Sequence, residues 1–224
     1  ILVILIPIRI SLLKIFFLQL FLLTSCSEIG EKDPEKLVNV KDIIPDIEID
    51  LKYATSDNFT KEILYQSNTC FLAYGALKNL KLVQDSLRNI RMHNGITYNE
   101  GLGLKVWDGY RPRSVQFRMW EIMPDARYVA DPEKGSSHNR GGAVDITIID
   151  FSTKNEINMP TDFDFFGIEA HHQYMGHPSD VIANRTLLKN IMTIIGGFST
   201  YQEEWWHYKF PESDNYPLRD IQIK

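Results

Sequence analysis

A histidine and a carboxylate lie close together in the stretch GSSHNRGGAVDITI, residues 135–148, and their surroundings indicate a metal site. The following apolar run reads as a strand, in which alternate side chains enter the core and Asp145 points to the opposite face. A buried carboxylate requires a partner, and either a metal ion or an arginine such as Arg140 satisfies that need. His138 lies in a loop whose glycines allow its imidazole to approach Asp145. An imidazole and a carboxylate together suit Zn²⁺.

The later stretch EEWWHY, residues 203–208, offers the remaining groups that a zinc hydrolase needs. We expect His207 to be the third ligand and Glu204 to lie beside the open fourth position, where a carboxylate activates water. In an ideal strand these two side chains point to opposite faces. The sequence therefore predicts an irregularity, such as a β-bulge, near Trp205.

The stretch VWDGYRP, residues 106–112, adds an electrophile. Arg111 follows the end of a predicted strand, where its guanidinium is able to stabilise charge on a carbonyl oxygen. Taken singly, each feature has a simpler interpretation: His138 as a loop histidine, WWH as an aromatic cluster, and Arg111 as a surface or salt-bridging residue. Taken together, they supply a metal, a base and an electrophile, so we predict a hydrolytic site.

The elements that must position these residues are mixed helices and strands. Periodic apolar residues predict helices at 71–95, 114–123 and 179–197. Alternating or aromatic runs predict strands at 102–107, 142–150 and 198–210. We expect Ser179 to cap the last helix. The irregular segments between the strands favour an α+β fold, with a central antiparallel sheet flanked by helices.

Composition is that of an ordinary globular protein, with 44% hydrophobic and 24% charged residues. The chain has 224 residues, and no second linker is evident, so residues 37–224 are expected to form one domain. The net charge of −5 and the absence of a long basic block make nucleic acid an unexpected partner. No pattern in the sequence predicts a protein partner.

The N-terminal residues 1–25 have the pattern of a secretory signal peptide, with basic residues, an apolar run and small residues in that order. The sequence LTSC at 23–26 resembles the end of a bacterial lipoprotein signal, which implies that Cys26 is lipidated. A transmembrane anchor is the alternative, but the apolar segment is short for one. Residues 26–36 are then the lipidated cysteine and a polar tether, and the protein is expected in the cell envelope, in the periplasm or at the outer membrane.

Lipidation of Cys26 leaves Cys70 as the only other cysteine. An intramolecular disulfide is then excluded, and we interpret Cys70 as a small buried residue.

Several motifs resemble those of the zinc D,D-peptidases. The pattern S-x-H-x-x-G-x-A-x-D is matched by Ser136, His138, Gly141, Ala143 and Asp145. Four further stretches are similar to the D-alanyl-D-alanine dipeptidases of the VanX type: YATSDNF, DGYRP, FDFFG and EWWH. They occur in the family's order between about residues 50 and 210.

This resemblance implies the α+β zinc D,D-peptidase fold, which is shared with Hedgehog-like domains, and hydrolysis of D-alanyl-D-alanine. One zinc ion per chain is implied, with the ligands His138, Asp145 and His207. The resemblance further implies that Glu204 is the general base and that Arg111 stabilises the tetrahedral intermediate. Asp164 is implied to bind the ammonium group of the dipeptide. Four residues are implied to line the pocket: Tyr53, Asp108, Ser136 and Trp205, of which Ser136 is a candidate for binding the substrate carboxylate.

Two other functions remain open from the sequence. A D,D-carboxypeptidase or endopeptidase acting on longer wall peptides would use the same fold. A zinc-stabilised binding module without catalysis is the second alternative, although Glu204 and Arg111 have no role there. Three further histidines, His171, His172 and His177, are interpreted as a solvated loop rather than a second metal site.

Overall fold

A five-stranded sheet in the order β2-β6-β7-β9-β8 forms the centre of residues 33–224, the part of the chain that this computed structural model describes. Its strands are β2 (Glu48–Ile49), β6 (Leu102–Asp108), β7 (Ala143–Asp150), β9 (Glu204–Lys209) and β8 (Ser199–Tyr201). The pairs β6–β7, β7–β9 and β8–β9 are antiparallel. β2 pairs with β6 in parallel, so the expected antiparallel sheet carries one parallel edge strand. The predicted signal peptide and Cys26 lie outside the described residues.

Short elements complete the N-terminal half. Two further two-stranded sheets are formed by β1 (Leu37–Asn39) with β3 (Phe71–Ala73) and by β4 (Met92–His93) with β5 (Ile96–Thr97). Short helical elements of the described residues include α1 (Val40–Ile43), η1 (Lys52–Ala54), η2 (His138–Arg140), η3 (Ile168–Ala170) and η5 (Pro211–Asn215). The carbonyl oxygens of Pro34 and Lys36 accept hydrogen bonds from the amides of Gly75 and Tyr74. The folded unit therefore begins before residue 37, inside the segment predicted as a tether.

The helix predicted at 71–95 is shorter in the structure. It is α2 (Tyr74–Leu87), which contacts β6 and buries Leu77, Leu80 and Val83. The preceding residues 71–73 form β3 instead. Asn94 and Gly95 have φ angles of 51° and 76°, and they form the turn between β4 and β5. An Asn-Gly pair favours such a hairpin turn, so it overrides the apolar period that continues beyond Leu87.

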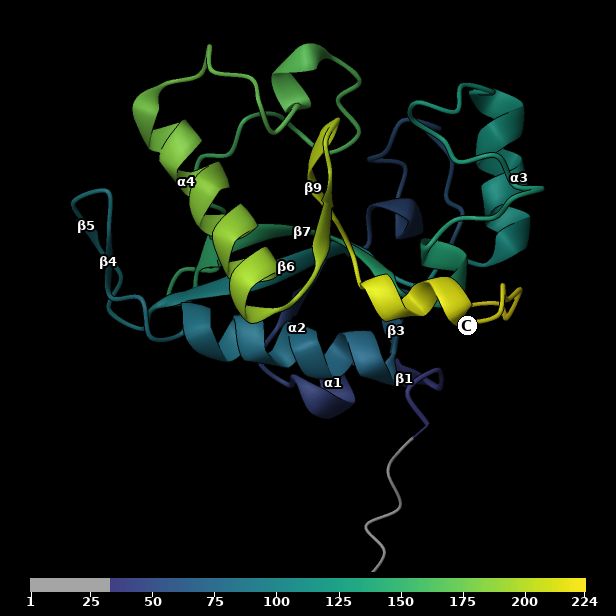
Figure 1. Cartoon of the computed structure of the whole chain (residues 1–224), viewed down its shortest axis with the longest axis horizontal. Coiled ribbons are helices and arrows are strands. Elements are labelled where there is room, and N and C mark those ends of the chain that lie inside the picture. Colours follow the sequence, from purple (N-terminus) through teal and green to yellow (C-terminus); the bar gives the residue numbers. More distant parts are fainter. Residues whose placement is uncertain (1–32) are drawn as a thin grey trace, which may run out of the picture. The chain divides into compact units, whose positions relative to one another are not determined.

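The other two helices lie close to their predicted ranges. α3 is Arg113–Ile122, and α4 is Ser179–Asn190 followed by the π-helical turn η4 (Ile191–Ile195). Gly197, with φ of 67°, follows this turn, as expected of a helix stop. The expected cap is wrong: Ser179 is the first helical residue, and Pro178 occupies the N-cap position. Figure 1 shows α2 along one side of β6 and β7, with α4 beside β9 and α3 at the other end of the sheet.

The aromatic segment 198–210 forms two strands rather than one. β8 and β9 are antiparallel neighbours, and their register shifts: Thr200 is opposite Tyr208, whereas Tyr201 is opposite Glu204. The extra residues therefore lie in β9, between Glu204 and Tyr208. The irregularity predicted near Trp205 is confirmed, and it changes which side chains of β9 share a face.

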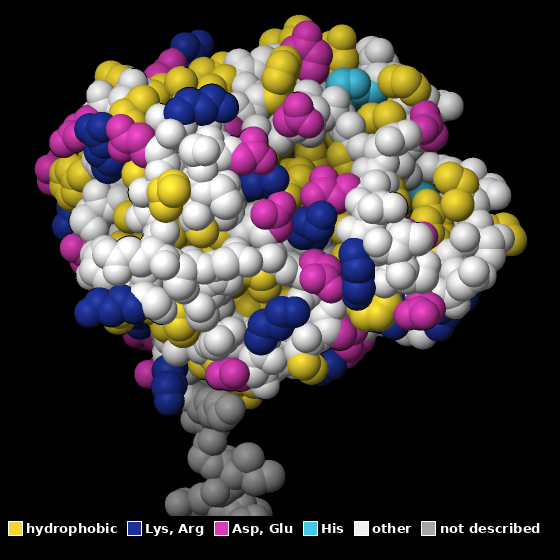
Figure 2. All heavy atoms as spheres, turned by 180° about the vertical axis from the view of Figure 1, so that it is seen from behind, with side chains coloured by type: hydrophobic (Ala, Val, Ile, Leu, Met, Phe, Trp, Pro, Cys, Tyr) yellow, Lys and Arg dark blue, Asp and Glu magenta, His cyan; other side chains and the backbone are white. Residues whose placement is uncertain are grey.

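Among the described residues, no helix has the length and apolar character needed to cross a membrane. Figure 2 shows basic and acidic side chains interspersed on one face of the molecule, so no broad basic surface gathers on that face.

Candidate active site

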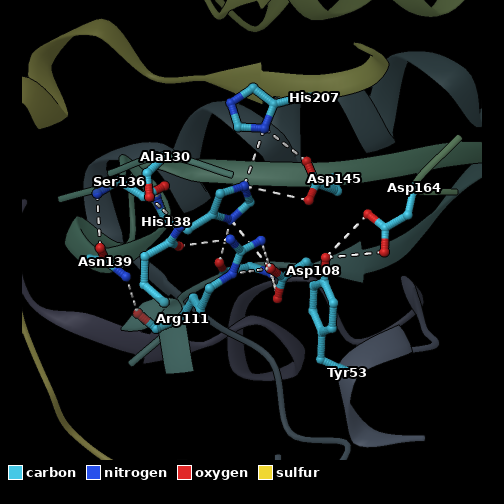
Figure 3. Close-up of polar contacts among 12 residues, drawn as sticks. Tyr53, Asp108, Arg111, Ala130, Ser136, His138, Asn139, Asp145, Asp164 and His207 are labelled. Carbon is cyan, nitrogen blue, oxygen red and sulfur yellow. Dashed lines mark hydrogen bonds and ion pairs between the residues drawn. The ribbon is translucent and has the colours of Figure 1, made fainter. Parts of the chain in front are cut away.

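Three side chains from two strands and one loop converge on one point. The pairing of β7 with β9 sets Asp145 directly opposite His207, and the turn η2 brings His138 beside them. The Nδ1 of His207 lies 2.9 Å from an oxygen of Asp145, and the Nε2 of His138 lies 3.4 Å from the other oxygen. The two imidazole nitrogens are 3.2 Å apart. The structure thus brings together the three predicted ligands, as Figure 3 shows.

The chemistry of this group fits a divalent metal such as zinc. Two imidazole nitrogens and one carboxylate oxygen lie within 4.8 Å of one another, and both His138 and Asp145 are buried. The Nδ1 of His138 lies 2.7 Å from the carbonyl oxygen of Gly109, to which it donates. That contact leaves the lone pair of Nε2 facing the other ligands, as in metal-binding histidines. Three ligands with room for a fourth are typical of catalytic zinc sites.

The protonation states of Asp145 and His207 also suit a metal. Burial by itself raises the pKa of Asp145, but the adjacent imidazoles of His138 and His207 outweigh it, so the pKa lies below its usual range. Burial lowers the pKa of His207, despite its hydrogen bond with Asp145. An ionised carboxylate and a neutral imidazole are the forms that coordinate a metal.

Glu204 lies beside this group because of the irregularity in β9. Its Oε2 is 3.9 Å from the Nδ1 of His207. Burial raises the pKa of Glu204 well above its usual range, and the negative charges of Asp145 and Asp164 raise it further. A carboxyl group that both accepts and returns a proton near neutral pH is suited to general acid–base chemistry.

Arg111 is held by a buried carboxylate. Its Nε and one terminal nitrogen donate to Oδ2 of Asp108 at 3.0 and 2.7 Å. The other oxygen of Asp108 accepts from the hydroxyl of Tyr65 and the amide of Gly109. Asp108 is fully buried, and its Oδ2 is also 3.6 Å from the Nδ1 of His138. This one carboxylate therefore orients the arginine and lies behind a predicted metal ligand.

Asp164 is a further acidic residue of the site, and Figure 3 shows it beside Asp145 with Tyr53 reaching toward it. The hydroxyl of Tyr53 donates to both carboxylate oxygens, at 3.1 and 3.2 Å, and the amide of Phe59 donates at 3.3 Å. Burial, together with the charge of Asp145, raises the pKa of Asp164 to about 7, although the hydrogen bond from Phe59 opposes this shift.

These groups open into one cavity of about 450 Å³. Its lining includes the three predicted metal ligands and most of the other predicted site residues: Glu204, Arg111, Asp164, Tyr53 and Ser136. The hydroxyl of Ser136 accepts from the amide of His138, so it is fixed at the start of the turn η2.

Two predicted lining residues do not reach the cavity. Asp108 is fully buried and accepts hydrogen bonds from Arg111, which lies between it and the cavity. Trp205 is fully buried among Trp107 and Trp206, and its Nε1 donates to the hydroxyl of Thr161. Trp206 lines the cavity in its place. Asp108 and Trp205 were implied to line the pocket by the family resemblance alone; in this chain the register of β9 places the Trp205 side chain in the core.

A wall of the cavity was missed by sequence reasoning. Residues 126–130, ARYVA, line it between α3 and η2, and the hydroxyl of Tyr201 donates to the carbonyl oxygen of Arg127 from the other side. This segment has no helix or strand pattern, so no signal in the sequence identifies it. The three further histidines do not form a metal-binding group in the described part of the chain. His172 is buried beside Tyr208, and His177 bonds the carbonyl oxygen of Glu169.

Comparison with known proteins agrees with this geometry. The family model described as D-ala-D-ala dipeptidase matches residues 33–222. A D-alanyl-D-alanine dipeptidase of Escherichia coli is 37% identical over 186 residues, covering 83% of this chain and 90% of the relative. D-alanyl-D-alanine dipeptidases of Enterococcus faecalis and Enterococcus faecium are 33% and 32% identical, with 75% of this chain covered in each case and 89% and 87% of the relatives.

Proposed function

The chain belongs to the D-ala-D-ala dipeptidase family, and on this premise we propose that it is a zinc-dependent dipeptidase that hydrolyses D-alanyl-D-alanine. The observation that carries the proposal is that Glu204 and Arg111 line the same cavity as the group His138, Asp145 and His207. A binding module stabilised by a structural zinc ion needs neither a buried carboxyl group nor an arginine at this point.

The metal would be held by His138, Asp145 and His207. When bound, a zinc ion supplies Lewis-acid activation of water and of the scissile carbonyl group. The chain's own contribution is the orientation of the three ligands. The Gly109 carbonyl oxygen holds the tautomer of His138, and the pairing of β7 with β9 holds Asp145 against His207.

Glu204 handles the proton in this reaction. As the base, its carboxylate takes a proton from the attacking water, and the resulting carboxylic acid then gives that proton to the leaving amine. The raised pKa of Glu204 supports the second step, because burial favours the protonated carboxyl group that donates to the amine. Its separation of 3.9 Å from His207 supports action at the metal rather than at a distant part of the cavity.

Arg111 stabilises the negative charge that develops on the carbonyl oxygen. A guanidinium group has five N–H donors, and three of those of Arg111 are used by Asp108 and Gln116. One N–H remains on each terminal nitrogen, and Arg111 lines the cavity. These two donors are therefore available to a substrate oxygen.

The two ends of the dipeptide need opposite charges. We assign the ammonium group to Asp164, whose carboxylate is supported by Tyr53 and Phe59, and the carboxylate end to Ser136. An ammonium ion beside Asp164 favours the ionised form of this buried acid. A longer peptide lacks the free amine at this position and leaves the acid unpaired, which favours the dipeptide over carboxypeptidase or endopeptidase substrates.

One assay tests the proposal. The purified full-length protein is assayed for release of D-alanine from D-alanyl-D-alanine, with zinc measured in the same sample, before and after treatment with a chelator. We expect activity in proportion to bound zinc, loss on chelation and recovery when zinc is restored. Faster hydrolysis of D-Ala-D-Ala-terminated tripeptides or muropeptides would replace the dipeptidase with a peptidase for longer substrates, and bound zinc without any hydrolysis would indicate a binding module.

We further propose that the protein is anchored in the cell envelope through a lipid on Cys26. The motif LTSC and the preceding apolar run support this location. Labelling with a palmitate analogue is expected to mark the wild-type protein and not a Cys26→Ser variant, which should also leave the membrane fraction. Equal labelling of both proteins contradicts the proposed anchor.

A further inference from the structure

A buried glutamine on α3 connects the arginine of the site to the wall of the cavity. The side-chain oxygen of Gln116 accepts from a terminal nitrogen of Arg111 at 2.9 Å. Its amide nitrogen donates to the carbonyl oxygen of Ala130, also at 2.9 Å. Gln116 is fully buried, and both ends of its amide are therefore satisfied within the protein.

The contacts of Arg111 explain why a second support matters. Both bonds to Asp108 end on the same atom, Oδ2, so this carboxylate holds one edge of the guanidinium at a single point. Two hydrogen bonds that converge on one acceptor atom leave the guanidinium plane freer to tilt than bonds to two separate acceptors. The bond to Gln116 supplies a second point, on the other terminal nitrogen, and two points define the direction of the remaining N–H donors.

The partners of Gln116 require an amide at this position. The guanidinium of Arg111 can only donate hydrogen bonds, so its partner must be an acceptor. The carbonyl oxygen of Ala130 can only accept, so its partner must be a donor. A carboxylate satisfies the first partner alone, and an apolar side chain satisfies neither. The orientation of the Gln116 amide is therefore set by its two neighbours.

Ala130 belongs to the cavity wall formed by residues 126–130. The backbone amides of Tyr128 and Val129 in this wall donate hydrogen bonds to the carbonyl oxygen of Asp125. The hydroxyl of Tyr201, in the β8–β9 hairpin, donates to a backbone carbonyl oxygen of the same wall. The side chain of Gln116 therefore connects this wall to Arg111. Figure 3 shows Ala130 and Arg111 on the same side of the site as His138.

We infer that Gln116 is a positioning residue: it fixes the guanidinium of Arg111 against the 126–130 wall, so that two N–H donors face the substrate oxygen. It does not touch the substrate, and its effect passes through Arg111. This inference rests on the proposed function, because the substrate oxygen is that of the dipeptide amide.

A double-mutant cycle tests the inference. The kcat and KM values for D-alanyl-D-alanine are measured for the wild type, Gln116→Met, Arg111→Ala and the double variant. We expect Gln116→Met to lower kcat by about 10- to 100-fold, with little change in KM, because small misplacements of a catalytic group have effects of this size. In the Arg111→Ala background the same substitution is expected to change kcat less than about threefold. Equal losses in both backgrounds would overturn the inference.

Two further variants separate positioning from folding. Gln116→Glu keeps an acceptor for Arg111 and is expected to retain more kcat than Gln116→Met; the reverse order contradicts the inference. Gln84→Met is the matched control, since Gln84 is also a fully buried glutamine on a helix, with its oxygen bonded to the amide of Leu104. We expect this control to lose stability while kcat is unchanged, and a comparable loss of kcat in the control contradicts a specific role for Gln116.

A measurement independent of turnover distinguishes failure of this inference from failure of the proposed function. The side-chain Nε–H of Arg111, identified by its loss in Arg111→Ala, is expected to exchange at least about tenfold faster with solvent in Gln116→Met, because the guanidinium is freed to pivot. Unchanged exchange overturns the positioning role. An inactive, zinc-loaded wild type overturns only the proposed reaction, and the exchange experiment still decides the role of Gln116.

Discussion

The carboxylate of Glu204 lies 3.9 Å from the imidazole of His207, although the two residues are three positions apart in one strand. Regular alternation would direct them to opposite faces of the sheet. The extra residues in β9, opposite the step from Thr200 to Tyr201, remove this conflict. A local irregularity of the sheet thus places the proposed base next to a proposed metal ligand, and the chemistry of the site depends on it.

Replacing the proposed base with its amide should remove turnover and leave the metal in place. We expect Glu204→Gln to lower kcat by roughly 10²–10⁴-fold, which is the usual contribution of general acid–base catalysis, with about one zinc ion still bound per chain. Steady-state kinetics and metal analysis check this. The matched control is Glu203→Gln, at a neighbouring position outside the cavity lining, which should keep wild-type kcat. Wild-type activity in purified Glu204→Gln excludes the assignment of the base.

Removing a proposed metal ligand should instead weaken zinc binding itself. We expect His207→Ala to bind zinc at least tenfold more weakly, because only His138 and Asp145 then remain. The metal content of the purified protein and a competition titration with a chelator measure this loss. His93→Ala is the control, since His93 bonds Asn184 away from the site, and its zinc content should match that of the wild type. Retention of tight zinc binding by His207→Ala would falsify the proposed ligand set.

Removing the carboxylate behind Arg111 should lower the stability of the folded protein as well as its activity. Asp108→Ala leaves a buried guanidinium without its ionic partner, which typically costs about 3–5 kcal/mol of unfolding free energy. Urea denaturation measures this cost. The control is Asp85→Ala, which breaks the exposed pair with Lys81 and should cost less than about 1 kcal/mol. Similar losses in both variants contradict the proposed support of Arg111 by a buried ion pair.

Asp164 should make the stability of the metal-free protein depend on pH. Its pKa is raised from 3.8 to about 7, so the folded state binds a proton more tightly than the unfolded state does. The stability due to protonated Asp164 is fully present below about pH 4, and it is lost as the pH rises through about 7. We expect the unfolding free energy of the wild type to fall over this interval relative to that of Asp164→Asn.

Urea denaturation at several pH values from 4 to 8 gives this difference directly. The comparison uses the metal-free forms of both proteins, because bound metal changes the charge near Asp164. A constant difference between wild type and Asp164→Asn across the interval contradicts the raised pKa.

The sequence by itself determined which groups are proposed to supply the chemistry. Asp145 stands out because a carboxylate in an apolar strand needs a partner, and the residue types of His138, His207 and Glu204 complete the set of groups that a zinc hydrolase needs. β6, β7, α3 and α4 were also predictable, since each is a local run whose own periodicity outweighs its surroundings. The conflict between Glu204 and His207 even indicated the irregularity in β9.

Only the tertiary structure decided how these groups are supported. Trp205 lies in the core and Trp206 lines the cavity, because the register of β9 depends on its pairing with β8. Asp108 lies behind Arg111 instead of in the cavity, and Gln116 joins Arg111 to Ala130 from a helix. The contacts of Gln116 with Arg111 and Ala130 join residues whose spacing in the chain carries no period or motif. These contacts depend on how the helices and strands pack together in three dimensions. The chemical types of the proposed metal ligands, by contrast, follow from the side chains alone.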